Sequence, residues 1–215
     1  MHNRQKMGKS GKNRAFPLYF SAEYGIINKM CPVKRPGRQG REDMSKNFYD
    51  PQFNLTMLTD FYELTMANGY LVNGYADTIC YFDMFFRKVP DNGGFAIMAG
   101  VEQLVDYLKN LRFTEEDLEY LRSKHIFQEE FLDYLRHFTF ACDVWAVPEG
   151  TPIFPGEPIV TVRGPAIQAQ FIETMVLLCI NHQSLIATKT NRIVRAAQGR
   201  AVMEFGSRRA QGFDG

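Results

Sequence analysis

The sequence has few of the residues that build metal sites and disulfide frameworks. Of its 215 residues, four are cysteine and four are histidine, and none forms a CxxC pair or a histidine pair at metal-ligand spacing on one helix. This absence disfavours metal catalysis. No secretory signal sequence is recognisable, and three of the cysteines lie in apolar segments, so we expect free thiols in a reducing cytoplasm: Cys80, Cys142 and Cys179.

Long hydrophobic runs and an excess of one charge are also missing. The most apolar stretch, at 175–180, ends at Asn181, far short of the roughly 20 residues that cross a bilayer. Lys and Arg number 25 against 24 Asp and Glu, which gives no overall attraction to nucleic acid or to an anionic membrane. With 45% hydrophobic and 23% charged residues, the composition is typical of a soluble globular protein.

Residues 1–43 differ from the rest of the chain in charge. They contain ten Lys or Arg residues against three acidic residues. Three interpretations remain open: a disordered basic arm that binds nucleic acid, an organellar transit peptide, or an extension without a role. Because residues 44–55 look like an ordinary N-terminus that begins at Met44, we favour an over-extended start. We therefore expect residues 1–53 to form a disordered leader that contributes little to folding.

From residue 54 onward, the hydrophobic pattern changes repeatedly between the period of a helix and that of a strand. Thr114 followed by Asp117 has the spacing of a capping box, and Thr59 is the predicted N-cap of an earlier helix. This alternation predicts an α/β or α+β fold. The expected elements are a helix from Thr59 to Asn68 or Asn73, a strand at 78–88, a strand-to-helix segment at 95–111, helices at 114–123 and 129–137, edge strands within 142–165, a helix at 167–198 and a strand at 200–206.

The best candidate for a binding site is the segment 204–209, at the end of the last predicted strand. No dinucleotide-binding GxGxxG, phosphate-binding GxxxxGK[ST], GxSxG or HExxH string occurs elsewhere. Phe205 offers a face for a flat ring, and Arg208 and Arg209 suit a carboxylate or a phosphate. Pattern alone favours a core phenylalanine beside two solvated arginines. Tyr62 likewise fits a half-buried core residue.

Five strings occur in a fixed order along the chain: LTDFYELTMANGY, FDMFFRKVPDNGGFAIMAGVEQ, VPEGTPIFPGEPIVTVRGP, IETMVLLCINHQSLIATKTNRI and EFGSRRAQGFDG. Together they resemble the N-terminal half of nicotinate phosphoribosyltransferase over about residues 54–215. The resemblance implies an N-terminal α/β domain at 54–165 and the first elements of an irregular type II phosphoribosyltransferase α/β barrel at 166–215. It also implies a cytoplasmic homodimer with shared active sites.

The resemblance further implies a reaction. The family joins nicotinate to phosphoribosyl pyrophosphate, giving nicotinate mononucleotide and pyrophosphate, with ATP hydrolysed to ADP and phosphate and with Mg²⁺ present; this is the first step of NAD salvage from nicotinate. Four residues match substrate-binding positions of the family. Tyr62 corresponds to a tyrosine that reaches the nicotinate site of the neighbouring subunit, and Phe205 to the aromatic ring that stacks on the pyridine. Arg208 corresponds to the arginine that faces the substrate charge, with Arg209 supporting the same anionic pocket.

One part of the family pattern is missing from these 215 residues. The phosphorylatable histidine that couples ATP to turnover lies, in the family, beyond the position that matches Gly215, and neither His137 nor His182 has similar surroundings. We therefore expect the chain to be a fragment without ATP-coupled activity, and we assign no catalytic residue in it. Two alternatives remain: a nicotinamide-using relative, and a non-catalytic pseudo-enzyme subunit whose leader binds RNA.

Overall fold

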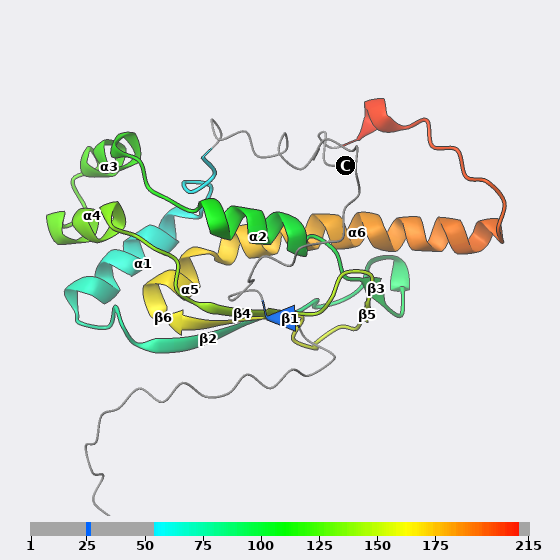
Figure 1. Ribbon diagram of the computed structural model, residues 1–215, viewed down its shortest axis with the longest axis horizontal. Helices are drawn as coiled ribbons and strands as arrows, with labels where there is room; N and C mark the ends of the chain where they lie inside the picture. Colours follow the sequence, from blue (N-terminus) through cyan, green and yellow to red (C-terminus); the bar gives the residue numbers. More distant parts are fainter. Residues whose placement is uncertain (1–24, 27–53, 211–215) are drawn as a thin grey trace, which may run out of the picture.

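The computed structural model describes residues 25–26 and 54–210 (Figure 1). The other residues of the predicted leader, and residues 211–215, lie outside this described part. The helices are α1 (Phe61–Val72), α2 (Val101–Asn110), α3 (Glu115–Arg122), α4 (Glu129–Arg136), α5 (Ala166–Phe171) and α6 (Glu173–Ala197), with single 3₁₀ turns η2 (Pro90–Asn92) and η3 (Ser207–Arg209). The strands are β1 (Gly25–Ile26), β2 (Ile79–Met84), β3 (Ala96–Ile97), β4 (Asp143–Ala146), β5 (Pro152–Ile153) and β6 (Val160–Pro165).

Four of the strands form one antiparallel sheet in the order β1-β4-β6-β2, and β3 pairs with β5 separately. Register places Tyr81 opposite Arg163 on one side and Asp143 opposite Arg163 on the other. The short strand β1 comes from the predicted leader, and its two residues pair with Trp145 and Ala146 of β4. The rest of the predicted leader lies outside the described residues, so its expected disorder stays a prediction.

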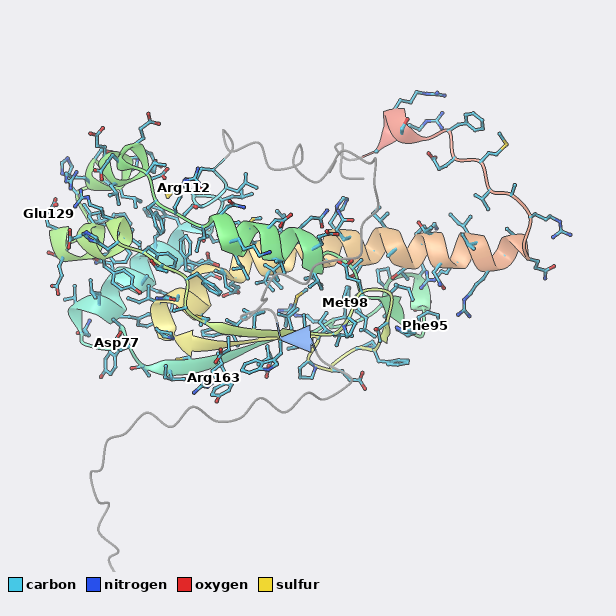
Figure 2. The ribbon with its side chains drawn as sticks, in the orientation of Figure 1. Asp77, Phe95, Met98, Arg112, Glu129 and Arg163 are labelled. Carbon is cyan, nitrogen blue, oxygen red and sulfur yellow. The ribbon has the colours of Figure 1, made fainter. Side chains whose placement is uncertain are left out.

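The two faces of the sheet differ in polarity, as the alternation in the sequence predicts. Val144, Val160 and Val162 are buried on the face that α5 and α6 cover. The opposite face carries Arg163, which Figure 2 shows on the side of the sheet away from the helices. Its Nε donates a 2.9 Å hydrogen bond to the hydroxyl of Tyr81, and its Nη1 donates one of 2.9 Å to Asp143. A polar row thus crosses three strands on the outer face.

The predicted helices at 114–123 and 129–137 are confirmed as α3 and α4. The capping box at the start of α3 is also confirmed. The backbone N–H of Asp117 donates to the hydroxyl of Thr114 at 3.2 Å, and the backbone N–H of Thr114 donates to the Asp117 carboxylate at 2.8 Å. Cys80, Cys142 and Cys179 form no disulfide within the described residues, and burial raises the pKa of the Cys142 thiol to about 12.

Three local predictions were wrong. Asp60, not Thr59, is the N-cap of α1, because the Thr59 hydroxyl instead donates to the carbonyl of Phe171 at 3.4 Å. The helix predicted at 167–198 is divided at Ile172, which ends α5 and precedes α6. Residues 200–206 form no strand, since within the described part of the chain no other strand pairs with them.

The α5–α6 stretch, Ala166–Ala197, has the length and mean hydropathy, 1.2, of a helix that can cross a membrane. This is weak support for a membrane span, because 44% of the most apolar window is buried inside the molecule. Ile172, Met175, Val176 and Ile180 all pack in the core. Internal packing therefore accounts for part of the apolar character of this stretch, while Leu178, Ile193 and Val194 of α6 are exposed.

The start of α2 lies very close to α6. Gly100 has a left-handed backbone with φ of 101°, and a Cβ atom there would lie 2.5 Å from the carbonyl oxygen of Cys179. A carboxylate oxygen of Glu149 accepts hydrogen bonds from the backbone N–H groups of Gly100, at 2.8 Å, and of Val101, at 2.7 Å. The adjoining backbone is bound to α6 as well, because the N–H of Ala99 donates to the hydroxyl of Ser184 at 3.1 Å.

Gly100→Ala should destabilise the chain more than a glycine substitution that changes the backbone energy alone. The left-handed conformation costs about 1–2 kcal/mol for alanine, and the clash with α6 adds about 1–3 kcal/mol. Gly150→Ala is the matched control, because Gly150 has φ of 83° but open space where the Cβ would lie. Urea unfolding of both variants measures the difference. If both variants lost the same free energy of unfolding, the close approach of Gly100 to Cys179 would not contribute to the cost of the substitution.

Candidate functional site

Tyr62 lies in the first turn of α1, and its side chain is 44% exposed. Loss of water around the hydroxyl raises its pKa to about 12, and the Glu173 carboxylate contributes by its charge and by a hydrogen bond with that hydroxyl. Tyr62 is therefore protonated at neutral pH. Because nearly half of the side chain is exposed, Tyr62 is accessible to a ligand.

The residue after Tyr62 is a buried carboxylic acid that the sequence analysis did not single out. The side chain of Glu63 is fully buried, and its Oε1 accepts two hydrogen bonds from Thr174, one from the backbone N–H at 3.2 Å and one from the hydroxyl at 3.0 Å. Its Oε2 makes no hydrogen bond with any described residue. Burial raises the pKa of Glu63 to about 7, against the lowering effect of the two Thr174 bonds; the charges of Glu173 and Asp60 raise it further.

A second buried hydroxyl lies within electrostatic reach of Glu63. Burial raises the pKa of Tyr107, and the Glu63 charge adds to this shift. The Tyr107 hydroxyl has no hydrogen-bond partner among the described residues. The sequence pattern could have predicted that Glu63 is buried. Glu63 precedes the buried Ala67 by four residues, so both lie on the apolar face of α1.

The other three predicted site residues lie after α6. Phe205 is 73% exposed in the irregular segment between α6 and η3, and Arg208 and Arg209 are exposed in η3 itself. The carboxylate of Glu204 accepts a 2.5 Å hydrogen bond from the backbone N–H of Gly206, which shapes the turn after Phe205. An exposed phenylalanine contradicts the alternative of a core residue.

The structure does not bring Tyr62 together with the other three residues in one chain. Figure 1 shows α1 (cyan) at the left end of the molecule and η3 (red) apart from it, above α6. An active site shared between two subunits does not require the residues of one chain to meet. The assignment of Tyr62, Phe205, Arg208 and Arg209 to substrate binding stays a prediction.

A resident metal finds no support in the described part of the chain. No group of three or more His, Cys, Asp or Glu side chains there could hold a metal ion. We therefore derive no step through a metal from the described residues.

Comparison with known proteins relates this fold to one enzyme family. The family model of the nicotinate phosphoribosyltransferase N-terminal domain matches residues 57–181. Nicotinate phosphoribosyltransferase pncB2 of Mycobacterium tuberculosis is 47% identical over 158 residues, which are 74% of this chain and 34% of that protein. The Bacillus subtilis nicotinate phosphoribosyltransferase is 39% identical over 161 residues, 75% of this chain and 33% of that protein. The chain thus spans about a third of the length of these relatives.

Solved structures agree with the sequence matches. The crystal structure of human nicotinic acid phosphoribosyltransferase aligns with a TM-score of 0.66 and 37% identity, covering 73% of this chain and 32% of the human chain. A nicotinate-nucleotide pyrophosphorylase from Pyrococcus furiosus aligns with a TM-score of 0.53 at 23% identity, over 82% of this chain and 36% of its own. The second likeness shows a shared fold alone.

Glu63 should make the stability of the chain depend on pH. Its folded-state pKa of about 7 lies above the ordinary 4.5, so its stabilising contribution is complete below pH 4.5 and is lost as the pH rises through 7. Glu63→Gln cannot ionise and should remove this loss. Relative to the variant, the free energy of unfolding of the unaltered chain should fall by up to about 3 kcal/mol between pH 4.5 and 8.

Denaturant unfolding at several pH values tests this expectation. Glu116→Gln is the control, because Glu116 is an exposed glutamate in the first turn of α3 and its replacement should leave the pH profile unchanged. Parallel profiles for the unaltered chain and Glu63→Gln would contradict a raised pKa at Glu63.

Proposed function

Because the chain belongs to the nicotinate phosphoribosyltransferase family, we propose that it contributes the N-terminal domain and part of the ring-binding surface of an enzyme that joins nicotinate to phosphoribosyl pyrophosphate. The observation that carries this proposal is the family-model match over residues 57–181, which includes the turn that presents the exposed ring of Tyr62. The family resemblance and the mixed helix and sheet fold expected from the sequence are both confirmed.

The proposed role of these residues is to bind and orient a flat anionic ring. Tyr62 and Phe205 each expose an aromatic face, and two such faces can hold a pyridine between them. Arg208 and Arg209 are exposed cations on the same segment as Phe205 and suit the nicotinate carboxylate or a phosphate. Negative charge develops on the departing pyrophosphate, so catalysis would depend on placement and on electrostatic stabilisation.

We further propose that the working enzyme is a cytoplasmic homodimer. Because α1, which carries Tyr62, lies apart from the turn η3 that follows Phe205, we infer that the two rings face the same pyridine from two different subunits. ATP coupling and Mg²⁺ belong to this proposal through the family resemblance alone. The division of the chain into a domain at 54–165 and barrel elements from 166 onward belongs to the proposal as well.

The function can be tested with a chimera that joins residues 54–215 to the C-terminal two thirds of the M. tuberculosis relative. The chimera should form nicotinate mononucleotide from nicotinate and phosphoribosyl pyrophosphate, faster when ATP and Mg²⁺ are present, and should use nicotinamide poorly. The 215-residue chain alone should form none, because it corresponds to only about a third of its relatives. Turnover by the chain alone, or equal use of nicotinamide by the chimera, would contradict the proposal.

Mixing two weakened variants of this chimera tests the shared site. Tyr62→Ala removes one ring contact and Arg208→Ala removes the cation, so each homodimer should lose affinity for nicotinate by about 1–3 kcal/mol, and turnover with it. A mixed dimer has one site with both residues intact, and activity should partly return. Tyr62→Ala mixed with Phe205→Ala should also recover. If neither mixture gains activity, Tyr62 does not act across a subunit interface.

A further inference from the structure

The first turn of α1 is bound to the α5–α6 junction on both sides of Tyr62. Before it, the Thr59 hydroxyl donates to the Phe171 carbonyl at 3.4 Å. The backbone N–H of Asp60 donates to the Thr174 hydroxyl at 3.2 Å. After it, the Glu63 carboxylate accepts both Thr174 bonds. Residues 59, 60 and 63 therefore fix the backbone that carries Tyr62, and each contacts a residue more than a hundred positions away.

We propose that Glu63 and Thr174 are positioning residues that hold the Tyr62 ring in the orientation needed to contact nicotinate. The part of this inference that concerns nicotinate rests on the proposed function. The part that concerns the orientation of Tyr62 rests on the hydrogen bonds alone.

Thr174 is the centre of this arrangement. Its hydroxyl is at once an acceptor for the Asp60 N–H and a donor to Glu63, and its backbone N–H belongs to the first turn of α6, where N–H groups lack helical partners. The Glu63 carboxylate thus acts as a cap of α6 supplied by α1. No described side chain of α6 caps its N-terminus in the usual way, because Ile172 occupies the N-cap position.

The same turn of α6 also acts electrostatically on the Tyr62 hydroxyl. Glu173, whose charge raises the pKa of the Tyr62 hydroxyl, is the residue directly before Thr174. If the Thr174 bonds are lost, Glu173 and the start of α1 can move apart, and the Tyr62 hydroxyl loses this neighbour. Because nearly half of the Tyr62 side chain is exposed, packing alone holds it weakly. Small misplacements of a substrate-contacting group are costly, since a shift of about 1 Å can reduce a rate about a hundredfold.

Thr174→Val is the sharpest variant. It keeps the shape of the side chain and the backbone N–H, and removes the one hydroxyl that joins Asp60 to Glu63. Thr174→Ser restores the hydroxyl and is the rescue. Thr190→Val makes the same change at an exposed position of α6 and is the matched control.

The orientation of Tyr62 can be measured by NMR on the 215-residue chain at neutral pH. In the unaltered chain, Tyr62 should show one χ1 rotamer from its scalar couplings, magnetisation transfer between its ring and the Glu173 side chain, and slow hydrogen exchange at the Asp60 amide. Thr174→Val should average the rotamers, abolish the transfer and speed that exchange roughly tenfold or more. Thr174→Ser and Thr190→Val should match the unaltered chain. An unchanged Tyr62 in Thr174→Val would overturn the proposal.

Kinetics of the chimera test the consequence for nicotinate. Thr174→Val should raise the KM for nicotinate roughly threefold to tenfold, as expected for one or two lost hydrogen bonds, and leave the KM for phosphoribosyl pyrophosphate unchanged. A general loss of stability would instead lower the amount of active enzyme without changing either KM. A changed NMR signature with an unchanged KM for nicotinate would refute the positioning role. If the unaltered chimera forms no nicotinate mononucleotide, that result would count against the proposed function. The NMR result would still decide whether Thr174 orients Tyr62.

Discussion

The crossing of α1 on the α5–α6 junction depends on one buried carboxylic acid. Burying an ionised glutamate without partners would cost much of the free energy of folding. Glu63 is tolerated here for two reasons: Thr174 donates two hydrogen bonds to one of its oxygens, and burial favours its protonated form. The same contact satisfies an N–H group at the start of α6. The break between α5 and α6 and the first turn of α1 are therefore held by one group of atoms. Tyr62 lies in the middle of that group.

The α6 helix extends this constraint along the molecule. Its buried Ser184 and Thr188 bind the backbone of Ala99 and Ile97, so that the segment leading into α2 follows the helix. Gly100 permits the closest approach of the two. At its far end α6 leads into the exposed segment with Phe205, Arg208 and Arg209 (Figure 1). One rigid helix thus separates the two parts of the predicted ring-binding surface, and this separation is the physical basis for proposing a site built from two subunits.

Local patterns in the sequence were sufficient for elements whose stabilising contacts are local. The capping box of α3 involves Thr114 and Asp117, three residues apart, and it could be read directly. Strands were also predicted within 142–165, where β4, β5 and β6 lie, but β4 and β6 are not edge strands, because each pairs with a strand on both sides. The N-cap of α1 could not be read this way, because Thr59 binds Phe171, 112 positions along the chain. The division at Ile172 has the same cause, since Glu63, 111 positions before Thr174, caps α6. Residues 200–206 have the composition of a strand, but a strand also needs a partner.

The family, and with it the roles expected of Tyr62 and Phe205, came from ordered strings that no single physical pattern explains.

The central claim is that Tyr62 of one subunit and Phe205 of the other face the same bound ring. It can be tested most directly by chemical cross-linking in the chimera. Chimeras with Tyr62→Cys and with Phe205→Cys are mixed and treated with a short bis-maleimide reagent, and each variant alone serves as the background for the native thiols. The account predicts a covalent dimer that forms only in the mixture and that nicotinate suppresses by occupying the space between the two positions. Efficient cross-linking within a single chain of the double variant, or a dimer that forms regardless of nicotinate, would contradict it.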